Sequence, residues 1–195
     1  MGLDKLKKWN DAYQNADIAL AIPAQVLKEN EFLLPTKGLA LDLACGRGGN
    51  ALFLARLNSA NFQVDAVDIS PVVLEQLKNY ANLHDLPIDC YVRDVESEGL
   101  LKKEYDVIVI SYFLCRDLFP EIVAALKPNG LLFYQTWAQD KVDDTGPKNP
   151  QFRLEPTELL DLTKPLVPLY YQENGMMGDV AKGLRNEAML IACKK

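Results

Sequence analysis

The sequence has a single histidine, His84, and its four cysteines form no C-x-x-C pair. Zinc sites in proteins draw on clustered cysteine and histidine ligands, so no metal site is predicted. No run of 18 apolar residues occurs, and the opening segment MGLDKLKK contains no apolar stretch of signal-peptide length. These absences argue against a membrane span and a secretory leader, and they predict a cytoplasmic protein with reduced thiols.

Positive charge is also scarce. Lys and Arg number 21 against 27 Asp and Glu, which gives a formal net charge of −6 at pH 7. A protein that follows the phosphates of a nucleic acid needs a basic face to displace counterions, so a nucleic-acid substrate is disfavoured. A G-x-S-x-G segment is missing as well, which argues against a serine hydrolase.

What remains is an ordinary globular composition, with 49% apolar and 25% charged residues over 195 positions. This length suits one domain, and we expect residues 1–195 to form it. Residues 1–35 are predicted to be an N-terminal helical cap, because apolar residues recur at helical spacing and Pro23 suits the first position of a helix. Residues 36–195 are predicted to be an α/β core.

Within that core, short apolar runs alternate with helical patterns. The predicted strands cover 38–44, 62–68, 88–92, 105–111, 130–137, 167–174 and 187–195, and the predicted helices cover 50–57, a segment from Pro71, 118–128 and 157–166. Ser70 and Thr157 are predicted to cap two of these helices. Strands that are apolar on both faces indicate a parallel sheet covered by helices on each side, so the predicted fold is doubly wound α/β and Rossmann-like. The two C-terminal strands are predicted to pair antiparallel, and the long polar segment 138–156 is predicted to form part of a lid.

One window, ALDLACGRGGNA (40–51), carries the chemistry. Gly46, Gly48 and Ala51 satisfy G-x-G-x-x-A between a strand and a helix, a pattern that dinucleotide-binding proteins share. Asp42 would repel a pyrophosphate but would suit the ammonium group of an amino acid. Asp68 ends the second strand, where a carboxylate can accept both ribose hydroxyls. An amino acid and a ribose on one ligand point to S-adenosylmethionine.

With these residues the chain resembles the class I S-adenosylmethionine-dependent methyltransferases over nearly its whole length. Four segments carry the resemblance: D-L-A-C-G-R-G (42–48), V-D-I-S (67–70), R-D-V (93–95) and L-K-P-N-G (126–130). The resemblance implies a seven-stranded sheet in the order 3-2-1-4-5-7-6 with strand seven antiparallel.

A finer likeness concerns the segments outside those motifs. Trp9, Tyr13 and G-P-K-N-P-Q-F (146–152) are similar to the tellurite-resistance and thiopurine methyltransferase-like branch.

The resemblance also implies roles for single residues. Asp42 would organise the glycine loop and the ligand ammonium, Ala44 and Cys45 would contribute to the loop, Gly46 and Gly48 would allow close backbone approach, and Asp68 would hold the ribose. Ile69 would pack on the adenine, Asp94 and Val95 would read its edge, and Ser111, Tyr112 and Phe113 would border the methyl group. Trp9, Tyr13 and Trp137 are further candidates for substrate contact.

No convincing general base is present, so methyl transfer would depend mainly on proximity and in-line alignment. Residues 111–114 read S-Y-F-L rather than the Asn/Asp-Pro-Pro-aromatic run of enzymes that methylate amino groups of bases or glutamine. The Pro-Cys nucleophile of cytosine C5 enzymes is also missing. These absences favour a small-molecule acceptor, such as a soft sulfur, selenium or tellurium nucleophile. Two alternatives stay open, an NAD-dependent oxidoreductase and a catalytically silent S-adenosylmethionine-binding interaction protein.

Overall fold

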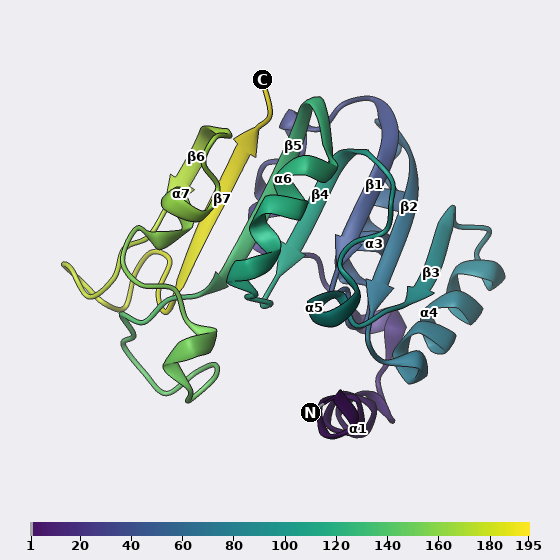
Figure 1. The fold of residues 1–195 in the computed structure, drawn as a ribbon, viewed down its shortest axis with the longest axis horizontal. Coiled ribbons are helices and arrows are strands. Elements are labelled where there is room, and N and C mark those ends of the chain that lie inside the picture. Colours follow the sequence, from purple (N-terminus) through teal and green to yellow (C-terminus); the bar gives the residue numbers. More distant parts are fainter. Residues whose placement is uncertain (1) are drawn as a thin grey trace.

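The computed structural model describes residues 2–195, with side chains from Asp4 onward. Seven strands form one sheet in the order β3-β2-β1-β4-β5-β7-β6 (Figure 1). The strands are β1 (Lys37–Leu43), β2 (Asn61–Asp68), β3 (Ile88–Val92), β4 (Tyr105–Ser111), β5 (Leu126–Trp137), β6 (Val167–Gln172) and β7 (Glu187–Cys193). Strand β7 runs antiparallel to both of its neighbours, and the other pairs are parallel. The predicted order and the antiparallel strand seven are confirmed.

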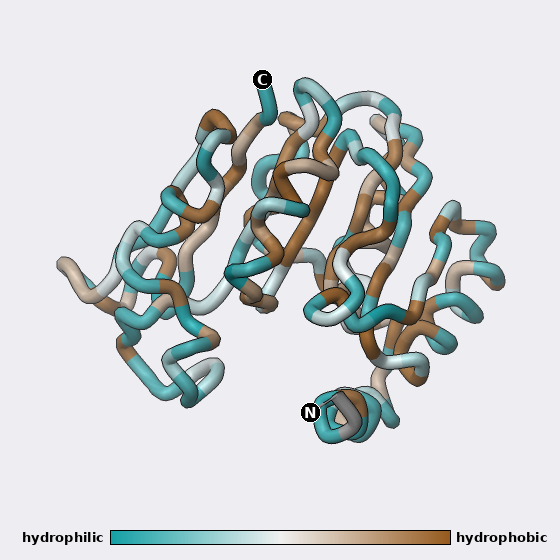
Figure 2. Tube along the Cα trace, viewed as in Figure 1, coloured by the Kyte–Doolittle hydropathy of each residue, from teal (hydrophilic) through white to brown (hydrophobic). Residues whose placement is uncertain are grey.

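Helices cover both faces of this sheet. They are α1 (Gly2–Tyr13), α2 (Gln25–Glu29), α3 (Gly49–Ala55), α4 (Pro71–Leu83), α5 (Val95–Glu98), α6 (Phe119–Ala125) and α7 (Glu158–Leu162). Buried side chains of α2, α3 and α4 share one apolar cluster with the sheet, and those of α5, α6 and α7 share a second cluster on the opposite face. The central strands are accordingly apolar, and polar residues lie mostly on loops and outer helix faces (Figure 2). The sheet is therefore buried on both sides, as the apolar strand patterns indicated.

Helix α4 shows how local sequence sets an element's start. Pro71 occupies the first turn, and the Ser70 hydroxyl accepts a hydrogen bond from the Val73 amide at 3.4 Å. Leu77 and Ala81 are buried on the same helical face as Val73. The predicted cap at Ser70 is confirmed, and it fixes where the chain turns back after β2.

Some predicted boundaries are wrong. The helix predicted at 118–128 ends at Ala125, because Leu126 already pairs with Tyr105 as the first residue of β5. Thr157 stands at the cap position of α7 but has φ +63° and no capping hydrogen bond from its side chain. Its backbone amide instead donates to the Glu173 carboxylate at 3.0 Å.

The N-terminal region is helical only in short pieces. Two 3-10 helices, Ile18–Leu20 and Glu31–Leu33, flank α2, and α2 begins at Gln25 rather than at Pro23. Helix α1 lies at the edge of the sheet where the parallel strands end (Figure 1). Lys5 ties it there through ion pairs with Asp94 at 3.1 Å and Glu96 at 2.8 Å.

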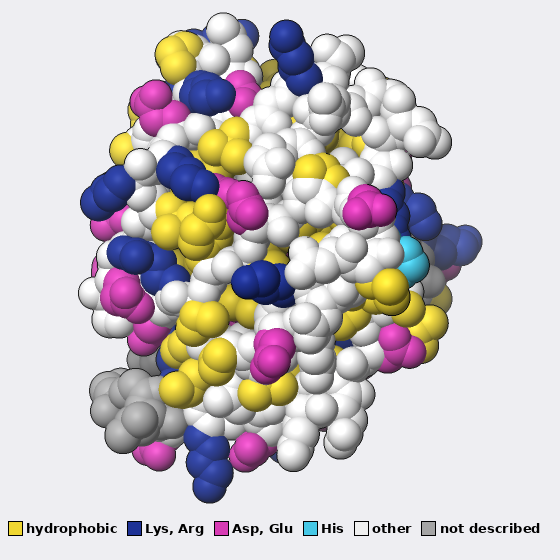
Figure 3. Space-filling model, turned by 90° about the vertical axis from the view of Figure 1, so that its right-hand side faces the viewer, with side chains coloured by type: hydrophobic (Ala, Val, Ile, Leu, Met, Phe, Trp, Pro, Cys, Tyr) yellow, Lys and Arg dark blue, Asp and Glu magenta, His cyan; other side chains and the backbone are white. Residues whose placement is uncertain are grey.

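Lys, Arg, Asp and Glu are intermingled on the face that Figure 3 presents, without a continuous basic stripe. No helix among residues 2–195 combines the length and the apolar character that a membrane crossing needs.

Segment 138–156 is anchored by a buried guanidinium. Arg153 is 4% exposed and donates to the backbone oxygens of Pro147 and Ala138, both at 2.8 Å, and to that of Thr145. A bridge between Ala138 and Leu154 closes the base of the loop. Arg153 therefore supplies the hydrogen bonds that regular secondary structure would otherwise provide.

We expect Arg153→Met to loosen this segment selectively. Methionine keeps the apolar stem but leaves several carbonyls without a donor, a loss of about 2–3 kcal/mol in the free energy of unfolding. Amide hydrogen exchange should accelerate across 138–154, and calorimetry should show a lower Tm. Lys148→Met, an exposed change in the same loop, is the control. Unchanged exchange in the Arg153 variant would contradict the anchoring role.

Candidate functional site

A cavity of about 1220 Å³ opens at the edge where the parallel strands end. Doubly wound folds bind ligands at this edge, because loops that follow each strand converge there. Its lining extends from α1, through the loop after β1 and the ends of β2 and β4, to the start of β7. Ligand pockets usually measure about 300–1,000 Å³, so this cavity has room for a cofactor and an acceptor together.

Most of the predicted site residues line this cavity. They are Ala44, Cys45, Gly46, Asp68, Ile69, Asp94, Val95, Ser111 and Tyr112 of the predicted cofactor set and Trp9, Tyr13 and Phe113 of the predicted substrate set. The structure brings these residues together, and their contacts with a ligand stay predictions. Asp42, Gly48 and Trp137 do not line it.

Asp42 lies beneath the glycine loop. Its side chain is fully buried, and its two carboxylate oxygens accept hydrogen bonds from the Asn50 side chain at 3.0 Å and the Ala51 amide at 2.9 Å. Burial raises the pKa of Asp42 to about 7, against the lowering effect of these hydrogen bonds. Asp42 therefore organises the loop from beneath and does not line the cavity, and its contact with a ligand ammonium stays a prediction.

Gly48 and Trp137 also have structural roles. A Cβ at Gly48, where φ is +75°, would lie 2.6 Å from the Leu77 side chain, so this glycine lets α3 approach α4, and its contact with a ligand stays a prediction. The Trp137 ring packs against the Tyr112 ring at a centroid distance of 5.0 Å. It packs against Tyr112 and does not line the cavity, and its contact with a substrate stays a prediction.

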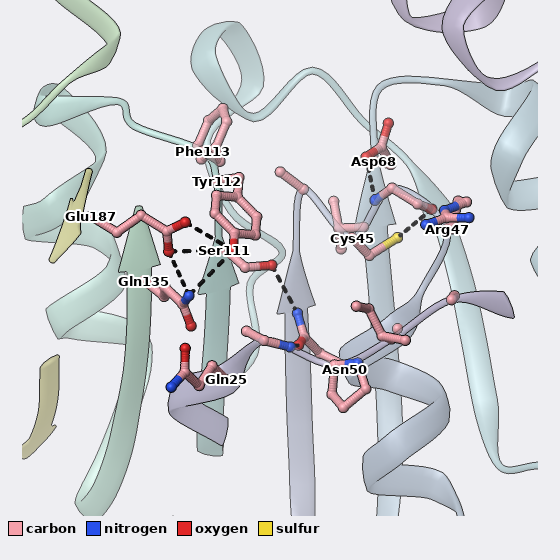
Figure 4. Close-up of a pocket in the computed structure, with 18 of the residues that line it drawn as sticks. Gln25, Cys45, Arg47, Asn50, Asp68, Ser111, Tyr112, Phe113, Gln135 and Glu187 are labelled. Carbon is pink, nitrogen blue, oxygen red and sulfur yellow. Dashed lines mark hydrogen bonds between the residues drawn. The ribbon is translucent and has the colours of Figure 1, made fainter. Parts of the chain in front are cut away.

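Asp68 faces the cavity and also holds its wall. One carboxylate oxygen accepts from the Gly46 amide and the other from the Ser70 amide, both at 2.9 Å (Figure 4). Burial raises the pKa of Asp68 above its ordinary value, although these hydrogen bonds act in the opposite direction. Each oxygen keeps a further lone pair, so the carboxylate can accept a ligand hydroxyl while it holds the loop.

Asp94 lies one strand further along the same edge. It caps α5 by accepting from the Glu96 amide at 3.3 Å, and it pairs with Lys5. Partial burial alone would raise the pKa of Asp94, but Lys5 more than offsets this and holds it below its usual value. A carboxylate that stays ionised here can accept from an amino group such as that of adenine.

Two buried amide side chains were missed by the sequence analysis. Asn50 donates to Ser111 at 3.1 Å and accepts from the Ala24 amide at 2.8 Å, and Gln135 accepts from the Val26 amide at 2.9 Å. Together they fasten the start of α2 to the sheet and make it a wall of the cavity. The signal available in the sequence was an asparagine or a glutamine inside an apolar segment. That signal does not identify the groups with which the side chain forms hydrogen bonds.

Glu187, also missed, lies at the far end of the cavity from Asp68. Gln135 donates to its carboxylate at 2.6 Å, and the Tyr112 hydroxyl donates at 3.3 Å (Figure 4). Burial raises the pKa of Glu187 above its ordinary value, against the effect of these two donors. Burial and the neighbouring carboxylate raise the pKa of Tyr112 to about 12.

The segments that border the cavity are not the segment that was predicted to form a lid. Helix α1 contributes Lys5, Trp9 and Tyr13, and the connection between β6 and β7 contributes 183–185. No residue of 138–156 lines the cavity. That segment is long and polar, but Arg153 ties it to itself through hydrogen bonds to Ala138, Thr145 and Pro147, and it lies outside the cavity lining, so the lid prediction is not supported.

We expect Asp42→Asn to change how stability depends on pH. A folded-state pKa of about 7 lies above the ordinary value of 3.8, so the contribution of Asp42 to stability is greatest at low pH and is lost as pH rises through 7. Asparagine does not titrate. The Tm of the variant minus that of the parent should therefore increase by about 5–10 °C from pH 4 to pH 8 in calorimetric scans. A constant difference would contradict the raised pKa.

The sequence of this chain is similar to those of known methyltransferase domains and of several curated proteins. Residues 40–130 match the family described as "Methyltransferase domain". Among curated proteins, the chain is 37% identical over 90 residues to Hemagglutinin 1 of Eikenella corrodens, covering 45% of this chain and 29% of that protein. It is 27% identical over 140 residues to carboxy-S-adenosyl-L-methionine synthase of Vibrio campbellii, covering 66% and 54%. The chain thus spans about half or less of the length of these curated relatives.

Among solved structures, TehB from Haemophilus influenzae superposes with a TM-score of 0.72 at 23% identity, over 96% of this chain and 67% of that one. The likeness at this identity is one of fold. Residues 40–130 are thus similar to a methyltransferase domain, and the whole chain shares its fold with TehB.

Proposed function

We propose that this protein is an S-adenosylmethionine-dependent methyltransferase that acts on a small-molecule acceptor. The observation that carries the proposal is one cavity with the glycine loop and Asp68 at one end and Tyr112 and Glu187 at the other. A nucleoside-bearing donor at the first end would direct its reactive group toward the second. The domain match over 40–130 covers the first end.

The residues at the first end fit S-adenosylmethionine. Gly46 has φ +51°, a conformation that favours glycine, and a Cβ there would lie 2.8 Å from the Tyr13 hydroxyl, so the glycine keeps this part of the loop open. Asp68 offers acceptors for ribose hydroxyls, and Ile69 and Val95 offer apolar contacts for a purine. When bound, S-adenosylmethionine supplies a sulfonium methyl group. The chain's task is then to hold the acceptor in line with it and to exclude water.

The acceptor's finer identity is also a proposal. Likeness of fold to TehB supports the tellurite-resistance and thiopurine methyltransferase-like branch, and the net charge of −6, with charges of both signs intermingled on the face in Figure 3, supports a small molecule over a nucleic acid. The proposal of a soft nucleophile as the acceptor is based only on the missing motifs of other methyltransferase classes. Glu187 makes an anionic nucleophile unfavourable there, since like charges would meet. We also propose that residues 1–195 form a single domain and that the protein is cytoplasmic, a location that suits its four free thiols.

The two alternatives make different demands. An NAD-dependent oxidoreductase would place a pyrophosphate above Gly46, and the burial of Asp42 removes part of the repulsion expected there. A silent binder would need the Asp68 end but not the Glu187 end. Binding of NAD(H) in preference to S-adenosylhomocysteine would identify an oxidoreductase. Binding of S-adenosylhomocysteine without methyl transfer from S-adenosylmethionine would identify a silent binder.

We expect S-adenosylhomocysteine to raise the Tm in a concentration-dependent manner, while NAD(H) does not. A ligand present at about 100 times its Kd stabilises by about 2.7 kcal/mol, which is roughly 5–10 °C for a chain of this size. Differential scanning fluorimetry with both ligands in parallel measures this. Stabilisation by NAD(H) alone would favour the oxidoreductase.

We expect Asp68→Asn to weaken S-adenosylhomocysteine binding by about tenfold to a hundredfold, because it removes the charge and one acceptor oxygen from the ribose contact. Asparagine is preferred to alanine, since its oxygen still accepts from one of the two amides of Gly46 and Ser70, whereas alanine would leave both without a partner. Calorimetric titration gives the affinity.

The matched control is Asp89→Asn, an exposed carboxylate on the outer strand β3 that should leave the affinity unchanged. Asp65 is unsuitable as a control, because its buried carboxylate holds Lys103 at 2.8 Å and Tyr105 at 2.9 Å. Equal affinity of the Asp68 variant and the parent would refute the ribose assignment.

A further inference from the structure

Glu187 is a carboxylate built into the cavity wall. Strand β7 runs antiparallel to β5, so its first residue pairs with Trp137 at the edge where β4 and β5 end. Gln135 fixes the carboxylate from one side, and its own amide orientation is set by the Val26 backbone N–H, which donates to the Gln135 side-chain oxygen. The position of Glu187 is therefore determined by the sheet and by α2 together.

This carboxylate has donors but no counter-ion. Gln135 and Tyr112 are both neutral, and no Lys, Arg or His side chain in the described part of the chain forms an ion pair with it. The guanidinium of Arg185, on the cavity wall nearby, is directed to the backbone oxygens of Lys182, Gly175 and Asp179. A half-buried, unpaired negative charge favours a cation in the adjoining space.

The ring of Tyr112 adds a second cation-binding feature beside it. Tyr112 has φ +55°, an uncommon conformation for an aromatic residue, and its amide donates to the Gln135 carbonyl at 2.9 Å. The side chain is 47% exposed, with the Trp137 ring packed against it. An aromatic face next to a carboxylate suits an ammonium ion, because the ring quadrupole and the full charge attract it together.

We propose that the methyl acceptor is a basic amine, bound as an ammonium ion between the Glu187 carboxylate and the Tyr112 ring, and that Glu187 takes its proton. This inference rests on the proposed function and narrows its substrate class. This reaction differs from methylation of a nucleobase or amide nitrogen, because the lone pair of such a nitrogen is delocalised. The Asn/Asp-Pro-Pro-aromatic run of the enzymes that methylate those nitrogens is also missing here.

The chemistry balances without a further reactant. The ammonium gives one proton to the Glu187 carboxylate, which becomes a neutral carboxylic acid and leaves a lone pair on nitrogen. That lone pair attacks the methyl carbon, the carbon–nitrogen bond forms as the carbon–sulfur bond breaks, and the bonding electrons stay on sulfur. The positive charge passes from sulfur to nitrogen. Glu187 afterwards releases its proton to water.

The raised pKa of Glu187 suits this exchange, since it brings the carboxyl closer to the range of an amine. The other ionisable side chains toward this end are Tyr112 on the β4 end, Lys28 and Glu29 on α2 and Arg185 before β7. Among them Tyr112 is the one that donates to Glu187.

Three probes of similar size test the proposal: benzylamine, benzyl mercaptan and benzoate. Each is titrated calorimetrically into the full-length protein saturated with S-adenosylhomocysteine. We expect benzylamine to bind at least tenfold more tightly than the other two, and Glu187→Gln to abolish that preference. With S-adenosylmethionine labelled in the methyl group, Glu187→Gln should lower transfer to benzylamine at least a hundredfold and leave S-adenosylhomocysteine affinity unchanged.

Glu31→Gln is the matched control, because it makes the same substitution and charge change at an exposed site outside the cavity. Preference for the mercaptan or benzoate, no binding of benzylamine, no transfer to it by the parent, or a preference that survives Glu187→Gln would each overturn the amine proposal. In those cases the parent still binds S-adenosylhomocysteine. A parent that does not bind it refutes the proposed function itself, and the inference with it.

Discussion

A buried carboxylate holds the turn on which the rest of the site depends. Asp42 ends up under the loop between β1 and α3, where it accepts from the Ala51 amide and the Asn50 side chain. Asn50 then reaches Ser111 at the end of β4 and the Ala24 amide before α2. One buried carboxyl group thus sets the loop, the neighbouring strand end and a cavity wall, and these hydrogen bonds offset only part of the cost of burying its charge, as the raised pKa of Asp42 indicates.

The sheet order determines which chemistry can meet at the cavity. Parallel strands bring Asp68 and Ser111 to one edge, and these ends lie on the donor side of the proposed site. Strand β7 enters from the opposite direction, so its first residue, Glu187, arrives at the same edge from the C-terminal part of the chain. The antiparallel strand therefore supplies the acceptor side with a residue that a purely parallel sheet of this order would place at the opposite edge.

The sequence was sufficient for the fold, and most of the residues that it predicted for the donor side line one cavity. Strand–helix alternation is a local pattern and indicated the α/β fold, whereas the family resemblance carried by the motifs implied the sheet order. Asn50 and Gln135 could not be assigned in this way, because their partners lie as far as 61 and 109 residues away. The same holds for Arg153, whose hydrogen bonds convert a polar loop of apparent mobility into an anchored segment.

The charges of the cavity residues and of the proposed donor relate the two ends of the cavity to each other. S-adenosylmethionine carries a net positive charge, and S-adenosylhomocysteine does not. Under the proposed function, the carboxylates Asp68 and Glu187 attract the cationic donor, and transfer moves the positive charge away from sulfur. A methylated ammonium near Glu187 would keep that charge opposite a carboxylate, whereas the neutral sulfur product would lose its attraction. Because Glu187 becomes a carboxylate again only after the transfer, this arrangement retains the charged product on the acceptor side and favours the release of the spent donor.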